Sequence, residues 1–226
     1  MKRVFIVSSV VLFFLFGLLS KYEDRAFIRN LDFAVTVRLQ ERIDRSSHLR
    51  AASVVGNLME GATFFASPEF ISIATICLTG LLLYDRKTKR WHLSALIIPL
   101  ALIVLVLIEI YSKSVVHHPA PVFSMIKNPT TIFPANYINE QFSYPSGHAA
   151  RGLFIAVIAG IWFIRGMLVR KGAVMLTLGL LGGYVMLVSI SRIYLGHHWF
   201  SDVAGGWLLG GACGIVYASF RYKKNV

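Results

Sequence analysis

Long apolar runs dominate this sequence and constrain its fold more than any other feature. A bilayer core needs about 20 mainly apolar residues per helix. Six windows close to that length occur, at 4–20, 62–84, 93–111, 149–164, 172–190 and 203–220. Hydrophobic residues make up 56% of the 226 and charged residues only 15%, a balance typical of membrane proteins. We therefore predict an all-α, polytopic membrane protein whose single domain, residues 1–226, is a six-transmembrane-helix bundle.

The amino-terminal run resembles a secretory signal, because it follows the basic residues Lys2 and Arg3. No small-x-small cleavage site ends this run and five more apolar runs follow, so we expect a retained first helix. Cys77 and Cys213 each lie inside an apolar run, where a packed thiol is more common than a disulfide.

Basic residues give the chain a formal net charge of +12. In a soluble protein this charge would suggest nucleic acid, but here the basic residues cluster at the ends of apolar runs. Anionic lipid head groups are therefore the expected partner, and nucleic acid is not. The short loops on the same side as the amino terminus are rich in Lys and Arg, which favours a cytoplasmic amino terminus in the cell membrane. Nothing in the sequence indicates an oligomeric state.

Residues 24–50 lie outside the runs but carry apolar side chains every three or four positions. This stripe consists of Ile28, Leu31, Val35, Leu39 and Ile43. Several arginines and Asp32 fall largely off the stripe, which predicts an amphipathic outer helix. Such a helix either lies in the interface and binds lipid head groups, or caps the bundle through its apolar face. The proline-rich segment 119–145 is expected to be a loop over the outer end.

Three polar clusters follow spans three and five or precede spans four and six. They are KSVVHHPAP at 113–121, YPSGH at 144–148 and SRIYLGHHWFSD at 191–202. With six spans, parity places all three clusters at one face of the membrane. That face is the outer, extracytoplasmic one if the amino terminus is cytoplasmic.

The second cluster has the features of a phosphate site at a helix start. Ser146 occupies the cap position, and the first turn of the following helix presents unpaired amides and the positive end of its dipole. Gly147 allows a ligand to approach the backbone, and His148 can donate a proton near neutral pH. The alternative is an ordinary helix start with an interfacial histidine.

The third cluster can supply a nucleophile. His198 and Asp202 are four residues apart at the start of a helix, so the carboxylate can accept a proton from one ring nitrogen and leave the other free to attack phosphorus. Arg192 offers a planar fork of donors suited to phosphate oxygens. One alternative pairs Arg192 with Asp202 structurally. Another builds a zinc site from the four histidines His117, His118, His148 and His198.

The first cluster supplies Lys113, whose ammonium group can neutralise phosphate charge. Its alternative role is that of a snorkelling residue at the end of a span. Glu109 lies four residues before Lys113, a spacing that favours pairing, and we predict that it positions the lysine.

Together the clusters resemble the signature of the type 2 phosphatidic acid phosphatase superfamily, membrane lipid phosphatases related to bacterial acid phosphatases and vanadium haloperoxidases. That signature is K-x6-R-P, then P-S-G-H, then S-R-x5-H-x3-D. The second and third motifs match at every fixed position, and the resemblance covers nearly the whole chain.

The resemblance implies roles for individual residues. His198 would be the nucleophile that forms a phosphohistidine, Asp202 would orient it, and His148 would protonate the leaving group. Four further residues would bind the phosphate, namely Lys113, Ser146, Gly147 and Arg192. The family needs no metal or other cofactor.

The first motif departs from the signature, because Ala120 stands where the family has arginine. An arginine clamp on a transferring phosphoryl group is worth several kcal/mol in comparable sites, or roughly 100-fold or more in rate. Three side chains could replace it: His117, His118 and Arg151. We favour replacement, since every other position of the signature is intact.

The leading hypothesis is an integral membrane phosphatase that hydrolyses a lipid phosphomonoester or pyrophosphate without a metal. Phosphatidic acid, phosphatidylglycerophosphate and a polyprenyl pyrophosphate are the candidate substrates, and the sequence does not choose among them. A second hypothesis is phosphotransfer to a lipid or sugar acceptor. A third is a non-catalytic protein that binds lipid phosphate. A transporter is disfavoured, because the polar residues gather at one face and not at the membrane midplane.

Overall fold

The chain is almost entirely helical in the computed structural model, which describes residues 2–45, 49–85, 89–127, 141–166 and 171–221. The helices are α1 (Lys2–Tyr22), α2 (Ala26–Arg45), α3 (Leu49–Phe64), α4 (Pro68–Leu83), α5 (Ile97–Val115), α6 (Gly147–Gly166), α7 (Lys171–Tyr194) and α8 (Phe200–Arg221). Two short 3-10 helices, η1 (Leu93–Leu96) and η2 (Phe123–Met125), flank α5. A small antiparallel hairpin joins β1 (Tyr84–Asp85) to β2 (Arg90–Trp91).

Within the described part of the chain, five helical segments are long and apolar enough to cross a membrane. A sixth span exists if α3 and α4 are counted together, since Val54–Phe64 and Pro68–Leu83 form a pair bent by 48°. The prediction of one continuous span at 62–84 is corrected at this break. Ser67 accepts a hydrogen bond from the Phe70 amide at 3.2 Å and caps α4, and Pro68 is its first residue. Serine followed by proline is a local start signal that ends the preceding helix.

Helices α6 and α8 are the most enclosed and lie at the centre of the bundle. About two thirds of the residues in the apolar windows of α6 and α8 are buried, at 61% and 67%, whereas the corresponding value for α1 and for α7 is 11%. Large apolar side chains cover the outside of the peripheral helices, including Phe14 on α1 and Leu180 on α7. Together with the long apolar helices, this surface makes the chain a multi-pass membrane protein. Both cysteines are free thiols, and Cys213 is buried as expected, whereas Cys77 is exposed.

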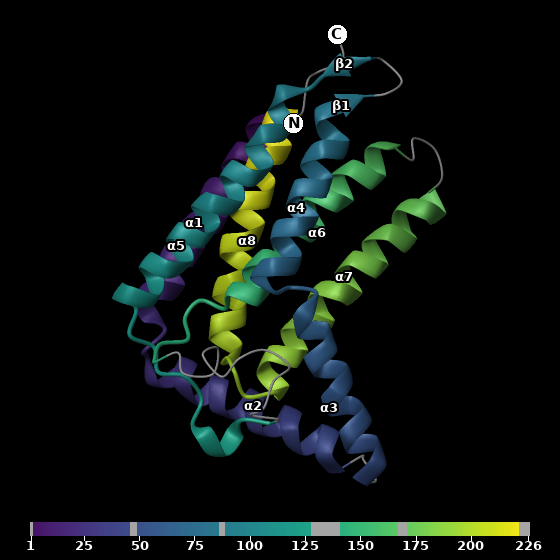
Figure 1. Cartoon of the computed structure of the whole chain (residues 1–226). Helices are drawn as coiled ribbons and strands as arrows, with labels where there is room; N and C mark the ends of the chain where they lie inside the picture. The colour runs from purple at the N-terminus through teal and green to yellow at the C-terminus, as the bar shows by residue number, and fades with distance from the viewer. Residues whose placement is uncertain (1, 46–48, 86–88, 128–140, 167–170, 222–226) are drawn as a thin grey trace.

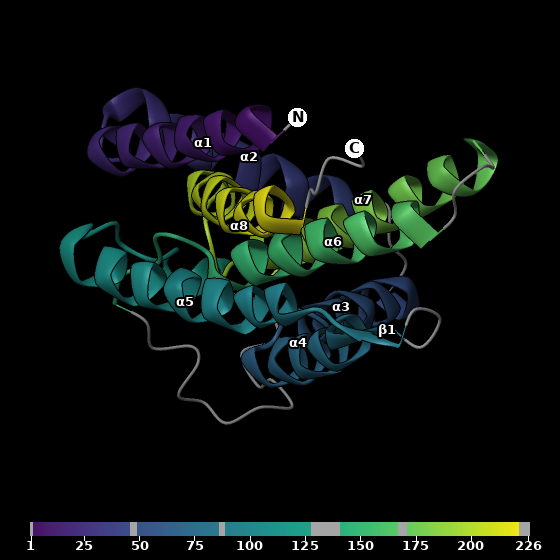
Figure 2. The same ribbon diagram turned by 90° about the horizontal axis from the view of Figure 1, so that it is seen from above.

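Helix α8 lies between α1 and α6 (Figure 2). Gly206, Gly210 and Gly214 repeat every four residues along α8 and therefore share one face. A Cβ atom at Gly206 would meet the Ser146 carbonyl oxygen, and one at Gly210 would meet the Ala150 backbone. The glycines allow the backbones of α6 and α8 to touch, which brings the helix start after Ser146 against the start of α8.

Helix α2 lies across one end of the bundle, whereas α1 begins and α8 ends at the other (Figure 1). Its buried face is polar and consists of Asp32, Thr36 and Gln40. Gln40 Nε2 donates to the carbonyl oxygens of Met125 at 2.7 Å and Tyr194 at 2.9 Å. The apolar stripe predicted for this segment borders that face, and Leu31 remains 38% exposed. Helix α2 thus caps the bundle through hydrogen bonds more than through apolar burial.

Candidate active site

The three polar clusters meet at the end of the bundle that α2 covers, as parity predicts. The Ser146 amide donates to the Asp202 carbonyl oxygen at 2.9 Å, which joins the second cluster to the third. Lys113 at the end of α5 reaches the same end of the bundle through Glu109, whose carboxylate abuts Gly147. Residues from four helices therefore build one site.

The turn between α7 and α8 determines where His198 lies. Gly196 has a φ of 70°, a left-handed conformation that favours glycine, and a Cβ there would strike the Met125 backbone. After this turn the amides of His197 and His198 donate to the Arg192 carbonyl oxygen at 3.1 and 3.2 Å. The reversal places His198 directly over the last turn of α7, which carries Arg192.

His198 faces Asp202, as the four-residue spacing predicts. Its Nδ1 lies 3.4 Å from Asp202 Oδ2, and both side chains are buried. The same Oδ2 accepts the Trp199 amide at 2.8 Å, and Oδ1 contacts His118 Nδ1 at 2.9 Å. With Nδ1 directed to the carboxylate, Nε2 is the ring atom left for attack on phosphorus.

Electrostatics favour the neutral form of His198. Burial lowers its pKa, and the charges of Arg192 and Lys113 act in the same direction. The hydrogen bond and charge of Asp202 oppose this shift, but the net pKa is lowered. The imidazole is therefore unprotonated at neutral pH, as a nucleophile must be.

Two cations share one buried carboxylate on the other side of the site. Glu109 Oε2 accepts Arg151 Nη1 at 2.6 Å, and Glu109 Oε1 lies 3.7 Å from Lys113 Nζ. The predicted pairing of Glu109 with Lys113 is thus present, with Arg151 as a second partner. A Cβ atom at Gly147 would fall on the Glu109 carboxylate, so only glycine lets this group reach the start of α6.

Several buried polar atoms at this end have no hydrogen-bond partner among the residues that the structure describes. They include Ser146 Oγ and Arg151 Nε. Ser146 takes the cap position of α6, where its carbonyl oxygen accepts the Ala150 amide at 3.0 Å, but its hydroxyl does not close the cap. Unpaired buried donors cost free energy, and an oxyanion placed among them would satisfy them.

Comparison with known proteins agrees with this geometry. The model of the PAP2 superfamily matches residues 94–225, more than half of the chain. The chain belongs to this superfamily. An undecaprenyl-diphosphatase from Sulfolobus acidocaldarius is 32% identical over 152 residues, which cover 67% of this chain and 66% of that protein. Phosphatidylglycerophosphatase B from Bacillus subtilis is 31% identical over 71 residues, which cover 31% of this chain and 35% of that protein. The chain thus matches less than two thirds of the length of either relative.

A solved structure shares the fold over almost the full length of this PAP2 chain. It is the crystal structure of a transmembrane PAP2 type phosphatidylglycerolphosphate phosphatase from Bacillus subtilis, with a TM-score of 0.73. The match covers 94% of this chain and 95% of that one at 20% sequence identity. The helical fold of this chain is therefore one already seen in a transmembrane PAP2 protein.

The structure separates the three side chains that could replace the missing family arginine. His117 is exposed, and its ring packs against Phe142 with the centroids 4.7 Å apart. His118 is buried and faces carboxylates. Arg151 alone lies beside the cluster of Lys113 and Glu109. Among the described residues, no group of three or more His, Cys, Asp or Glu side chains is arranged to hold a metal ion, so the four histidines do not form the alternative zinc site.

Sequence reasoning missed two carboxylates that line the site of this PAP2 chain. Glu23 lies between α1 and α2, and its Oε2 is 3.5 Å from His118 Nε2. Asp32 on α2 accepts both the amide and the hydroxyl of Ser201 at 2.7 Å, and so caps α8. Burial raises the pKa of each carboxyl group, against the charge of His118. Neither residue follows a local spacing rule, since the contacts join segments about 90 to 170 residues apart.

Proposed function

We propose that this PAP2 chain hydrolyses a phosphomonoester or pyrophosphate carried by a membrane lipid, through a phosphohistidine at His198. The observation that carries the proposal is the buried pair of His198 and Asp202, 3.4 Å apart, next to donors that have no partner of their own in the described chain. Both curated relatives are named as phosphatases of lipid substrates, which supports the same activity class for this chain.

The reaction takes two displacements at phosphorus. In the first, His198 Nε2 forms a bond to phosphorus while the bond to the leaving oxygen breaks, and His148 gives that oxygen a proton. In the second, water forms the new bond to phosphorus and the phosphorus–nitrogen bond breaks. The neutral His148 takes a proton from the water, so both histidines return to their starting forms. Asp202 stabilises the positive charge that His198 gains in the first step.

Phosphate oxygens are held by charged and backbone donors at the starts and ends of three helices. Arg192 and Lys113 supply positive charge, and Ser146 and Gly147 lie at the amino terminus of α6. We assign to Arg151 the charge that the family arginine would bring at Ala120. Arg151 is buried, is oriented by Glu109 and interacts electrostatically with His148, one turn away on α6.

An apolar groove near this site fits the hydrocarbon tail of a lipid substrate. Its volume is about 440 Å³, and it runs between α6, α7 and α8. Residues of α6, α7 and α8 line it, including Leu153, Gly160, Gly182 and Trp207. Leu153 lies five residues after His148, and Trp207 five residues after Asp202, so the groove starts within two turns of the proposed chemistry. A tail held there leaves its head group at the α2 end.

The proposed site opens to the extracytoplasmic face. The dense Lys and Arg in the short loops of the opposite side support this orientation. A His117→Cys thiol, exposed at the α2 end, tests it with a membrane-impermeant thiol reagent on intact cells. Labelling that occurs only in permeabilised cells would show that position 117 faces the cytoplasm and would contradict the proposed orientation.

Two other functions share this site chemistry. Phosphotransfer would pass the phosphoryl group from His198 to a lipid or sugar acceptor, and phosphate release would then depend on that acceptor. Non-catalytic lipid binding is favoured by one observation, the alanine at position 120 in place of the family arginine.

The decisive experiment measures phosphate release by the purified chain in detergent with a chelator present. The panel contains phosphatidic acid, phosphatidylglycerophosphate and a polyprenyl pyrophosphate, and His198→Ala is the matched inactive variant. We expect release from at least one lipid by the wild type and none by the variant. Binding without release for every lipid would instead support the non-catalytic function.

A further inference from the structure

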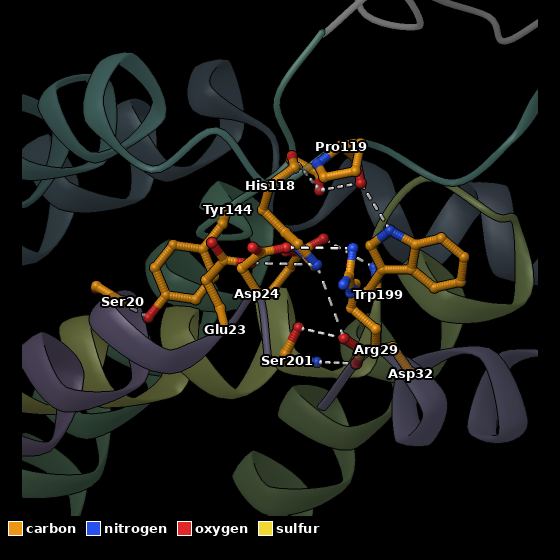
Figure 3. A network of polar contacts seen from close by, with 12 residues as sticks. Ser20, Glu23, Asp24, Arg29, Asp32, His118, Pro119, Tyr144, Trp199 and Ser201 are labelled. Carbon is orange, nitrogen blue, oxygen red and sulfur yellow. Dashed lines mark hydrogen bonds and ion pairs between the residues drawn. The ribbon is translucent and has the colours of Figure 1, made fainter. Parts of the chain in front are cut away.

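His118 lies among three carboxylates that come from different parts of the chain. Its Nδ1 contacts Asp202 Oδ1 at 2.9 Å, and its Nε2 lies 3.5 Å from Glu23 Oε2 and 3.9 Å from Asp32 Oδ2. The imidazole is 2% exposed, so it is shielded from water. Figure 3 shows it pointing between the α1–α2 turn, α2 and the start of α8.

Asp202 is therefore shared between two histidines that contact different oxygens. The contact with His118 has the length of an ordinary hydrogen bond, whereas the 3.4 Å contact with His198 is longer than one. The Trp199 amide at 2.8 Å fixes the oxygen that faces His198. His118 and the Trp199 amide are thus the two groups that set the plane of the carboxylate.

The segment that carries His118 is itself held firmly against the catalytic turn. Trp199 Nε1 donates to the Pro119 carbonyl oxygen at 2.8 Å, and the Ser143 amide donates to the His118 carbonyl oxygen at 3.0 Å. Glu23 and Asp32 approach the far nitrogen of the ring. His118 cannot shift without disturbing contacts to the α1–α2 turn, α2 and the start of α8.

We propose that His118 is a positioning residue, which holds the Asp202 carboxylate so that its second oxygen orients His198 Nδ1. This role rests on the proposed phosphohistidine chemistry. His118 itself is not one of the fixed positions in the three signature motifs. His118 acts through Asp202 and touches neither the phosphate nor the leaving group.

Charge suits His118 to this role. Burial lowers its pKa, but the hydrogen bond to Asp202 and the charges of Asp202, Glu23 and Asp32 outweigh burial, so the net pKa is raised. The surrounding carboxylates therefore favour the cationic ring, which donates from both nitrogens. Donation from Nδ1 keeps Asp202 ionised and fixed, and donation toward Glu23 and Asp32 offsets their charge.

The two nitrogens can be separated by substitution. The side-chain amide of asparagine lies near the position of Nδ1 and that of glutamine near Nε2. His118→Asn should therefore keep the bond to Asp202, and His118→Gln should keep only the contacts with Glu23 and Asp32. We expect kcat of the glutamine variant to fall about 10- to 100-fold, the effect of losing a hydrogen bond to a charged group. The asparagine variant should stay within about threefold of wild type, and KM should change little in either.

Inhibition by orthovanadate provides a second test of how His118 and Asp202 orient His198, because orthovanadate mimics phosphorus bonded to the nucleophile. Its inhibition constant should rise in His118→Gln in parallel with the fall in kcat, while inhibition by inorganic phosphate stays unchanged. His117→Asn and His117→Gln are the matched controls, since His117 is exposed and packs against Phe142.

Each result decides the question. A glutamine variant as active as the asparagine variant, or more active, would overturn the role, because charge or packing and not the Asp202 bond would then matter. If neither variant folds, Trp199→Phe removes the Pro119 bond without touching His118, and should lower kcat a few-fold at unchanged KM; an unchanged kcat would overturn the role. Wild type that releases no phosphate would refute the proposed function instead.

Discussion

Two buried carboxylates organise the two halves of this site, and they bind different kinds of partner. Glu109 contacts the cationic side chains of Lys113 and Arg151. Asp202 contacts the imidazole rings of His118 and His198. The first carboxylate therefore arranges cations suited to binding a phosphate, and the second orients the proposed nucleophile, His198, with His118 as its other partner. Substitutions around Glu109 should act on both binding and rate, and substitutions around Asp202 mainly on rate.

The largest effect in the Glu109 half is expected for Arg151→Ala. Loss of a charged donor to a transferring phosphoryl group should lower kcat/KM about 100-fold. Adding Ala120→Arg should restore at least about tenfold in that background but change wild type less than about threefold. Arg45→Ala is the matched control, since Arg45 is exposed and pairs only weakly with Glu41 at 3.5 Å. A tenfold gain from Ala120→Arg in wild type would show that Arg151 does not replace the family arginine.

A smaller effect is expected for Glu109→Gln. The amide can still accept one bond from Arg151 but cannot hold two cations by charge, so KM should rise about tenfold with a lesser fall in kcat. Steady-state kinetics on the best lipid of the panel measure this. If turnover and affinity were both untouched, Glu109 would have no positioning role, and the division of the site between two carboxylates would fail.

The pH dependence links the two halves. Because the pKa of His198 is lowered, its ring stays unprotonated to lower pH. The midpoint of the acid limb of kcat/KM should therefore lie below the ordinary histidine pKa of about 6.5. Lys113→Met removes a charge that lowers the His198 pKa, so its acid limb should move to higher pH. An acid limb at or above 6.5 in wild type would contradict the assignment of His198 as the neutral nucleophile.

The smallest effect is expected far from both carboxylates, in the apolar groove. A Cβ atom at Gly182 would meet nothing within 4 Å, so Gly182→Leu fills groove space without strain. KM for a long-chain lipid phosphate should rise about three- to tenfold, while a short-chain analogue is unaffected. Gly179→Leu, also open on α7 but outside the groove lining, is the control. Equal effects of the two variants would argue against a tail in the groove.

Much of this site could be predicted because its residues form local patterns. Ser146, Gly147 and His148 are consecutive, and His198 and Asp202 are only four residues apart, so spacing alone indicates that the members of each set lie together. Membrane parity then brings the clusters to one end. The pairing of Glu109 with Lys113 could be predicted for the same reason, since both lie on α5.

The missed features depend on contacts between distant segments. Asp32 looked like a solvent-facing residue of an amphipathic helix, yet it is buried because it caps α8. Nothing in the spacing of His118 indicates a bond to Asp202, which lies 84 residues away. The break before Pro68 differs, because serine followed by proline was a readable local signal inside an apolar run that otherwise favours one long span.

The glycine face of α8 gives the site a fixed register. His148 lies on α6 and His198 just before α8, and these two helices meet backbone to backbone at Gly206 and Gly210, while Val157 packs against Gly214. A slip of one residue along the helix axis would displace one histidine from the other by about 1.5 Å. Backbones in direct contact have no side chains that could repack to absorb such a slip. The separation of His148 and His198, the proposed acid and nucleophile, is therefore set by the contact between α6 and α8, and a substrate would have to fit that fixed separation.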